Sequence, residues 1–387
     1  MSALQKSHVQ DLLKQVHAAA TQPPELGPVL AALQRPTALV GIKSMAGITY
    51  AEGLRHKLPG AALILDDELP EAEYFGLRRV TTAQFEHMAR QMPLTVVDFS
   101  ESMFVQGYVR RICERTNADY VPFVQAMGAL DLHAVYQTTH VMRAETLARL
   151  DDFIALGDKL ADDASRITLY GLLLLRLNFD RSALRFGISE DSDEYFATRS
   201  VSRTFQLTDQ EYFIDCGAST GPVLQKFLGA TDWQFRAYHG FEPDPKNFAR
   251  LNAFRALELP NVHFHNAAVA DKPGKLRFAG GEDYSSRLDP NGNIEVPAVA
   301  LDDTVPEASF IKMDIEGAEV AALNGARRLI TQYRPRLAIT VYHYAHDLLN
   351  IFATIAAMGV PYQYRLAHYR QYYLDTVLYA TAGDDWG

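Results

Sequence analysis

Acidic side chains follow several short apolar segments in the second half of the sequence. Asp215 is followed by a loop that contains Gly217 and Gly221. Glu242 ends the next apolar segment, and Asp314 ends a later one. A carboxylate accepts hydrogen bonds from ammonium and hydroxyl groups and repels phosphate. Because ligands of parallel α/β sheets bind outside the carboxyl ends of the strands, these residues predict a site for a cationic ligand that carries hydroxyl groups.

The loop after Asp215 favours S-adenosylmethionine over a dinucleotide. It contains Gly217, Ala218 and Gly221, and glycines let a ligand approach the backbone. A dinucleotide loop favours G-x-G-x-x-G, whose second glycine makes room for a pyrophosphate, and that pattern is absent here. Glu242, which precedes Pro243, would accept hydrogen bonds from both ribose hydroxyls. The alternative is that Glu242 is an exposed acid before a proline turn.

Two further segments add candidate site residues. Asn266 and Ala267 end an apolar segment, and small residues there would leave room for an adenine ring. Asp314, Glu316 and Glu319 surround one strand-to-helix turn, and such a density of carboxylates is typical of a site. The three could bind magnesium, which would lower the pKa of an acceptor hydroxyl. The alternative for Glu316 and Glu319 is capping of a helix and pairing with its dipole.

Methyl transfer from a sulfonium is an in-line displacement, and a neutral hydroxyl acceptor also needs a base. His343 is the first candidate, because an imidazole with a pKa of about 6.5 suits this role near neutral pH. The alternative is a histidine hydrogen-bonded at a strand end. Asp314 is the second candidate base. His343 and His346 have the spacing of a zinc pair, but no third ligand lies nearby in the sequence.

Short apolar segments that alternate with helical stretches must position these residues, and this alternation predicts an α/β protein with parallel sheets. Residues 1–135 are expected to form a Rossmann-like N-terminal domain with a leading helix. Residues 136–204 are expected to form a helical connection and linker. Residues 205–387 are expected to form the domain that carries the site, and the last two extended segments predict a terminal hairpin.

The N-terminal domain offers two alternative functions. Gly41 and Gly47 follow its first predicted strand, with Lys43 and Ser44 between them, where a nucleotide-binding loop would lie. One alternative is therefore a nucleotide- or NAD-dependent oxidoreductase. The other is a non-catalytic binding or assembly module that retains a donor pocket. A scaffold for homo-oligomer formation or for acceptor choice is the preferred interpretation of this domain.

Composition excludes several classes of partner. The net charge of −10 and the absence of a Lys/Arg-rich run argue against a nucleic-acid partner. The apolar run at 172–175 is far shorter than the roughly 20 residues that span a bilayer, so no membrane span is expected. Cys113 and Cys216 are too few for a disulfide framework, and no signal peptide is apparent. These features predict a cytoplasmic protein.

Five segments in this order resemble FkbM-type methyltransferases: DCGASTG, GFEPDP, NAAV, KMDIEGAEVAALNGA and RPRLAITVYH. The resemblance covers about residues 205–380. It implies a class I methyltransferase fold, a Rossmann-like doubly wound sheet with an antiparallel last strand. It also implies S-adenosylmethionine as the donor and O-methylation of a hydroxyl on a sugar, glycan or polyketide-like acceptor.

The resemblance also implies roles for individual residues. Those that it places at the donor site or reaction centre are Asp215, Gly217, Glu242, Asp314 and Glu316. The chain departs from the family pattern at one position. Many relatives carry a glutamate two residues before the histidine that follows the fifth strand, whereas Val341 stands there in this sequence.

Overall fold

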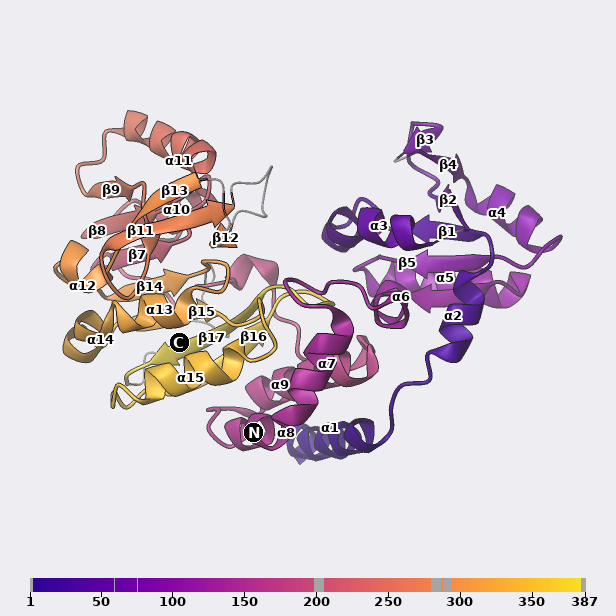
Figure 1. Cartoon of the computed structure of the whole chain (residues 1–387), viewed down its shortest axis with the longest axis horizontal. Coiled ribbons are helices and arrows are strands. Elements are labelled where there is room, and N and C mark those ends of the chain that lie inside the picture. Colours follow the sequence, from indigo (N-terminus) through magenta and orange to yellow (C-terminus); the bar gives the residue numbers. More distant parts are fainter. Residues whose placement is uncertain are drawn as a thin grey trace.

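The computed structural model describes residues 3–58, 60–74, 76–197, 205–279, 287–288, 292 and 294–383. Two α/β units lie on either side of a group of helices (Figure 1). Each unit is built around one largely parallel sheet. Within the described residues, no helix is both long and apolar enough to cross a membrane.

The N-terminal unit contains a six-stranded sheet with the order β3-β4-β2-β1-β5-β6, in which only β3 runs antiparallel to its neighbour. Its strands are β1 (Thr37–Val40), β2 (Ala61–Leu65), β3 (Glu73–Tyr74), β4 (Leu77–Val80), β5 (Thr95–Asp98) and β6 (Asp119–Pro122). Its helices are α2 (Gly27–Leu33), α3 (Met45–Lys57), α4 (Thr82–Ala89), α5 (Met103–Thr116) and α6 (Phe123–Leu130). This is the smaller Rossmann-like unit expected from the sequence.

Helices from two parts of the chain form the group between the sheets. They are α1 (Ala3–Thr21), α7 (Thr139–Ala148), α8 (Leu150–Gly157) and α9 (Asp163–Asn178), followed by the 3-10 turns η1 (Ser182–Phe186) and η2 (Asp191–Asp193). The leading helix α1 buries Leu12 and Val16 and packs along α9, away from the first sheet (Figure 1). The boundaries at residues 135 and 204 stay predictions, and residue 204 lies outside the described residues.

The C-terminal unit contains a seven-stranded sheet with the order β16-β17-β15-β14-β7-β8-β9. Its strands are β7 (Tyr212–Cys216), β8 (Ala237–Phe241), β9 (Val262–His265), β14 (Phe310–Met313), β15 (Arg336–Thr340), β16 (Gln363–His368) and β17 (Thr376–Thr381). All are parallel except β17, which runs antiparallel between β15 and β16. The predicted doubly wound sheet, antiparallel last strand and terminal hairpin are confirmed.

The remaining elements of this unit connect its strands. The helices are α10 (Pro222–Ala230), α11 (Pro245–Asn252), α12 (Leu301–Thr304), α13 (Glu319–Asn324), α14 (Arg327–Tyr333) and α15 (Asp347–Ala356), with the 3-10 turn η3 (Ala253–Leu257). A small sheet between β9 and β14 contains β10 (Ala268–Val269), β11 (Gly274–Ala279), β12 (Arg287–Leu288) and β13 (Ile294–Val299). The strand order of the large sheet reverses between β7 and β14, and ligands of such sheets bind at this switch point.

The carboxyl ends of the two large sheets face each other. Gln371, in the turn between β16 and β17, donates a hydrogen bond of 2.6 Å to the backbone oxygen of Glu101, which follows β5. Gln106 of α5 donates to the side chain of Gln371 over 2.7 Å. Buried Arg181 donates to the backbone oxygen of Ser100 and pairs with Asp98 at the end of β5. The switch point of the C-terminal sheet therefore opens toward the N-terminal unit.

Candidate active site

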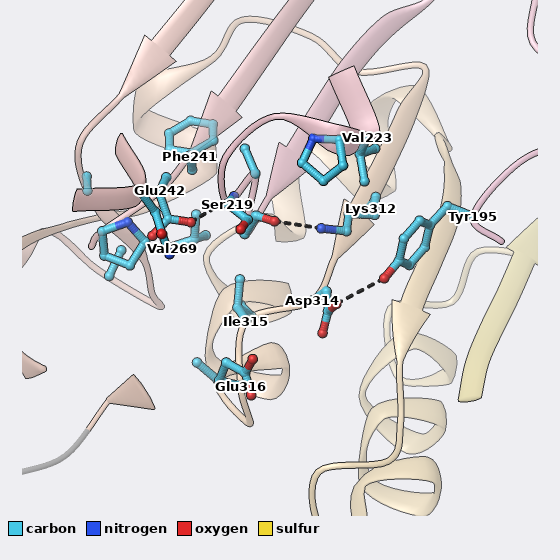
Figure 2. Close-up of a pocket in the computed structure, with 18 of the residues that line it drawn as sticks. Tyr195, Ser219, Val223, Phe241, Glu242, Val269, Lys312, Asp314, Ile315 and Glu316 are labelled. Atoms are coloured by element: carbon cyan, nitrogen blue, oxygen red, sulfur yellow. Dashed lines mark hydrogen bonds between the residues drawn. The ribbon is translucent and has the colours of Figure 1, made fainter. Parts of the chain in front are cut away.

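A pocket of about 360 Å³ lies at the carboxyl ends of β7, β8 and β14 (Figure 2). This volume falls within the range of about 300–1,000 Å³ that is typical of small-molecule sites. The predicted site residues that line it are Gly217, Ala218, Glu242, Pro243, Ala267, Asp314 and Glu316. Most of the predicted site is therefore brought together, and the pocket sits at the switch point.

Asp215 does not line the pocket, although the sequence analysis placed it in contact with the donor. Its side chain is completely buried at the end of β7 and pairs with Lys312 of β14, with 3.1 Å between the carboxylate and the ammonium. The hydroxyl of Tyr238 donates a second contact of 2.7 Å. Asp215 thus supports the loop that contains Gly217 and Gly221 from inside the sheet.

Lys312 joins this pair to the loop at the pocket floor. Its ammonium donates a hydrogen bond of 2.8 Å to the backbone oxygen of Gly217. Gly217 has a φ of +77°, and a Cβ there would lie 1.9 Å from the backbone oxygen of Asp314. Glycine is required at this position because the turn after β14 packs against the loop. This packing is a second reason for a glycine here, beside the predicted approach of a ligand to the backbone.

Glu242 lies at one end of the pocket and is 5% exposed. Its two carboxylate oxygens accept hydrogen bonds of 2.8 Å from the backbone of Ser219 and of Asp244. Burial raises the pKa of Glu242 to about 7, although these hydrogen bonds lower it. The carboxylate tip is therefore fixed between two loops and can change its charge near neutral pH.

Apolar residues surround Glu242 on the pocket wall. Phe241 and Val269 lie beside it in Figure 2, and Ala267 and Ala268 complete this part of the lining. Asn266 does not line the pocket. Its side-chain amide donates to the backbone oxygen of Glu242 over 2.9 Å, so it holds the strand end in place. This end of the pocket suits an adenine ring attached to a ribose.

Gly221 also lies outside the pocket lining, at the N-terminus of α10. It has a φ of +101°, and a Cβ would come within 2.6 Å of the ring of Phe254. Its role is to let the loop turn into the helix. Two of the predicted donor contacts beside Asp215, those of Gly221 and Asn266, are therefore supports of the pocket wall in this structure.

The other end of the pocket is polar (Figure 2). Asp314 accepts a hydrogen bond of 2.9 Å from the hydroxyl of Tyr195 and a longer one of 3.4 Å from Tyr342. Glu194 also lines this end, and burial raises its pKa to about 8. Lys312 lies 5.1 Å from the centre of the Tyr195 ring. Both charge signs are therefore present where a ligand with an ammonium and a carboxylate would fit.

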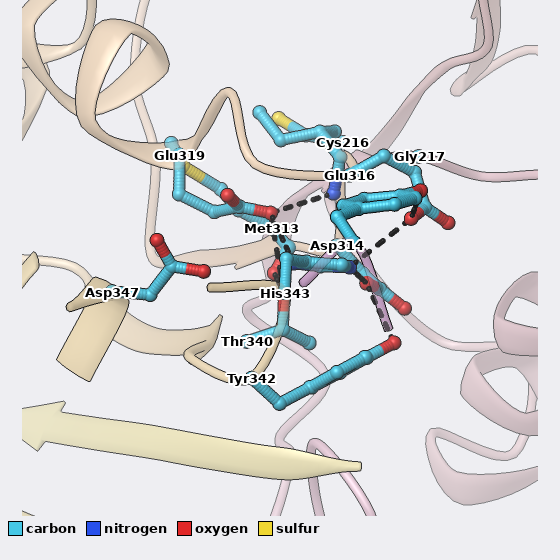
Figure 3. Close-up of polar contacts among 12 residues, drawn as sticks. Cys216, Gly217, Met313, Asp314, Glu316, Glu319, Thr340, Tyr342, His343 and Asp347 are labelled. Atoms are coloured by element: carbon cyan, nitrogen blue, oxygen red, sulfur yellow. Dashed lines mark hydrogen bonds and ion pairs between the residues drawn. The ribbon is translucent and has the colours of Figure 1, made fainter. Parts of the chain in front are cut away.

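A buried histidine lies among the carboxylates of Asp314, Glu316 and Glu319 (Figure 3). His343 follows β15 and is 0% exposed. Its Nε2 is 3.5 Å from Asp314 and 3.2 Å from Glu316, and its Nδ1 is 3.5 Å from Glu319. The predicted magnesium ligands were Asp314, Glu316 and Glu319. Within the described part of the chain, the group with ligand atoms within 4.8 Å of one another is Asp314, Glu319 and His343.

The charge of His343 bears on its predicted role as a base. Burial lowers the pKa of the ring, but the carboxylates of Glu319, Glu316 and Asp314 outweigh burial and raise the pKa to about 10. A ring protonated at neutral pH cannot accept a further proton. His343 also does not line the pocket, whereas Asp314 does. The geometry therefore favours Asp314, the second candidate base.

Residues missed by the sequence analysis complete the site. Tyr195 comes from the segment expected to be a linker, and its sequence gives no sign of a site. Lys312 could have been found as a lysine within an apolar strand. Tyr136 comes from the loop between α6 and α7, and its hydroxyl hydrogen-bonds to Glu316. Its ring lies nearly parallel to that of His343, with the centres 5.9 Å apart.

The loop of the N-terminal unit that contains Gly41 and Gly47 is occupied by side chains of the protein itself. Ser44 caps α3, and its hydroxyl donates to the backbone oxygens of Gly41 and Phe99. The backbone amide of Ala46, in the first turn of α3, donates to the carboxylate of Glu101 over 3.0 Å. Helix N-termini attract anions. Here the carboxylate of Glu101 lies at the N-terminus of α3, where a nucleotide phosphate would bind.

Comparisons with known proteins agree with this geometry. Residues 215–364 match the model of the methyltransferase FkbM domain. The crystal structure of an FkbM methyltransferase from Methylobacillus flagellatus KT is similar to this chain, with a TM-score of 0.76 and 25% sequence identity. The match covers 96% of this chain and 100% of the other, so it includes the N-terminal unit. No curated protein sequence matches the chain.

Other solved structures match only part of the chain. A precorrin-6y C5,15-methyltransferase from Geobacter metallireducens GS-15 has a TM-score of 0.29 and 14% identity, and the match covers 46% of this chain and 82% of the other. Fibrillarin from Aeropyrum pernix, solved with S-adenosyl-L-methionine, has a TM-score of 0.31 and 11% identity, with coverages of 45% and 69%. Residues 215–364 match the methyltransferase FkbM domain, and the chain as a whole is similar to a solved FkbM methyltransferase.

Proposed function

We propose that this protein is an S-adenosylmethionine-dependent O-methyltransferase that acts on a hydroxyl of a sugar, glycan or polyketide-like small molecule. The observation that carries the proposal is a single pocket with Glu242 at one end and Asp314 at the other. The first carboxylate suits a ribose and the second suits a reacting hydroxyl. Location in the cytoplasm and assembly into a homo-oligomer stay predictions.

The residues present fit the donor. Glu242 would accept the ribose hydroxyls, and Phe241 and Val269 would cover the adenine ring. Lys226 and Lys312 line the pocket and are cations available to the donor carboxylate, and Asp314 is a carboxylate for its ammonium or for the acceptor. S-adenosylmethionine supplies a methyl group on a positively charged sulfur, which leaves as a neutral thioether.

The acceptor end derives its chemistry from Asp314. The hydroxyl of Tyr195 holds one oxygen of this carboxylate and thereby orients it toward the pocket. As the new carbon–oxygen bond forms and the carbon–sulfur bond breaks, the hydroxyl proton passes to Asp314. Holding the acceptor oxygen in line with the methyl group is the larger contribution, and the residues of the pocket wall serve it.

Calorimetry with S-adenosylmethionine and a transfer assay with labelled donor test this function. We expect Glu242→Gln to weaken donor binding, and Asp314→Asn to abolish transfer while the donor still binds. The matched control is Glu295→Gln, an exposed acid on β13 outside the pocket, which should change neither. Unaltered donor affinity in Glu242→Gln would remove the proposed donor site. Donor binding without transfer to any sugar, glycan or polyketide would favour a binding module.

A further inference from the structure

Two partly buried side chains of opposite charge line the pocket without an ion-pair partner. They are Glu194, which follows η2, and Lys226 of α10. Within the described residues, no ion pair joins either one to another side chain, and none joins the two to each other. Buried charges are normally paired, because burial removes the water that would otherwise stabilise them. A ligand that carries both charges would supply both partners.

The fold holds these two side chains at the polar end of the pocket. The ammonium of Lys226 donates a hydrogen bond to the backbone oxygen of Glu194 and lies 4.4 Å from the centre of the Phe196 ring. Neither contact is to a carboxylate, and an ammonium has three N–H donors, so donors remain for a ligand. Tyr195, which follows Glu194, donates a hydrogen bond to Asp314 (Figure 2). The pair therefore lies beside the proposed base.

The protonation of both groups is shifted against their charged forms. Burial lowers the pKa of Lys226 to about 8. Burial, together with the carboxylates of Asp375 and Asp314, raises the pKa of Glu194 to about 8, although the cations of Arg370 and Lys226 oppose this shift. A bound counter-charge would stabilise the charged form of each group. Both side chains therefore gain more from a zwitterionic ligand than from a neutral one.

The other acids at this end of the pocket already have partners. Asp191 pairs with Arg370 across 2.5 Å. Asp314 accepts hydrogen bonds from two tyrosine hydroxyls, and Glu316 accepts one. Among the described acids that line this end, Glu194 is the one whose carboxylate has neither a hydrogen bond nor an ion pair. It is therefore the acid most available to a cationic group of a ligand.

The two lysines of the pocket differ in the same way. Lys312 is paired with Asp215 across 3.1 Å and donates to the backbone oxygen of Gly217. Its charge is therefore neutralised before any ligand binds, whereas the charge of Lys226 is not. One acid and one cation thus remain for a ligand at this end. The amino acid end of S-adenosylmethionine carries the matching pair, an ammonium and a carboxylate on one carbon atom.

We infer that Glu194 and Lys226 form the subsite for the amino acid end of S-adenosylmethionine, with the ammonium on Glu194 and the carboxylate on Lys226. This inference rests on the proposed function and deepens it. The adenosine half of the donor would then reach Glu242 at the other end of the pocket. Asp314 is not needed for the donor ammonium, so its carboxylate stays available for the acceptor hydroxyl.

Calorimetry on the full-length chain tests the subsite without any methyl transfer. The probes are S-adenosylmethionine, its decarboxylated form, which keeps the ammonium, and methylthioadenosine, which lacks the whole amino acid end. Glu194→Gln should weaken binding of the first two by about 10- to 100-fold, because a charge-assisted hydrogen bond is lost. Lys226→Met should weaken binding of S-adenosylmethionine by a similar factor and leave that of the decarboxylated form unchanged. Neither variant should change the affinity for methylthioadenosine.

The matched controls are Glu190→Gln and Lys275→Met, which alter exposed side chains outside the pocket and should leave all three affinities unchanged. Binding of methylthioadenosine shows that a variant keeps a folded pocket. Unaltered affinity for S-adenosylmethionine in Glu194→Gln or in Lys226→Met would overturn the inference. So would equal losses for S-adenosylmethionine and methylthioadenosine, or an equal effect of Lys226→Met on the decarboxylated form.

The wild-type chain provides a test that needs no variant. It should bind S-adenosylmethionine at least about 100-fold more tightly than methylthioadenosine, and equal affinities would exclude the subsite. The same titrations separate the subsite from the proposed function. If both ligands bind and Glu242→Gln weakens both while Glu194→Gln weakens neither, the donor site stands and the subsite is wrong. If neither ligand binds the wild-type chain, both the donor site and the subsite are wrong.

Discussion

The buried pair of Asp215 and Lys312 gives a prediction whose size follows from the structure. The side chains are 0% and 2% exposed, and the charges are 3.1 Å apart. With an effective dielectric constant of about 20, two charges at this distance attract by about 5 kcal/mol. Removing one partner of a buried pair typically costs about 3–5 kcal/mol, because the other charge remains buried alone. We therefore expect Lys312→Met to lose about 4 kcal/mol of unfolding free energy.

The double variant Asp215→Asn with Lys312→Met should be much closer to the wild type than the sum of the single losses, because no unpaired charge remains. Urea unfolding followed by circular dichroism measures these differences. The control is Lys275→Met, whose partner Glu295 lies on the surface, and no measurable loss is expected there. A loss below about 1 kcal/mol in Lys312→Met, or additive losses in the double variant, would refute the reasoning.

Four further predictions concern Glu242, Tyr136 and the N-terminal unit. Because burial raises the pKa of Glu242 to about 7, donor affinity should rise about tenfold from pH 6 to pH 8, and Glu242→Gln should remove this dependence. The same raised pKa means that Glu242 contributes less to folding stability as pH rises from about 4.5 to 7, which the pH dependence of urea unfolding measures. Tyr136→Phe should slow transfer by about tenfold while donor affinity in calorimetry is unchanged, since the bond to Glu316 is lost; equal loss of donor affinity would contradict this role. NADH fluorescence should not change on mixing, because Glu101 occupies the start of α3, and a saturable change would revive the oxidoreductase alternative.

The features that the sequence predicted are those carried by local patterns. Short apolar runs end in polar residues at the parallel strands of the C-terminal sheet, so these strands could be located from the sequence. Glu242 and Asp314 were identified because each is the first acid after such a run. The position of a residue at a strand end is a local property, and the pocket follows from parallel pairing.

The features that the sequence could not predict depend on cross-strand neighbours. Asp215 and Lys312 are register partners on β7 and β14, and nothing in either segment shows that the lysine neutralises the acid. The charge of His343 likewise depends on carboxylates in the turn after β14 and at the start of α13. Tyr136 reaches the site from outside residues 215–364, and only tertiary packing reveals a contact of this kind.

The position of β17 constrains the order in which the C-terminal sheet can form during synthesis. Its residues 376–381 leave the ribosome after all the other strands, yet they belong between β15 and β16. Until then those two strands present unpaired edges, and such edges are templates for pairing with other chains. A ribosome that stalls before Thr376 would therefore release a chain in which β15 and β16 have open edges, and such a product is a candidate for aggregation.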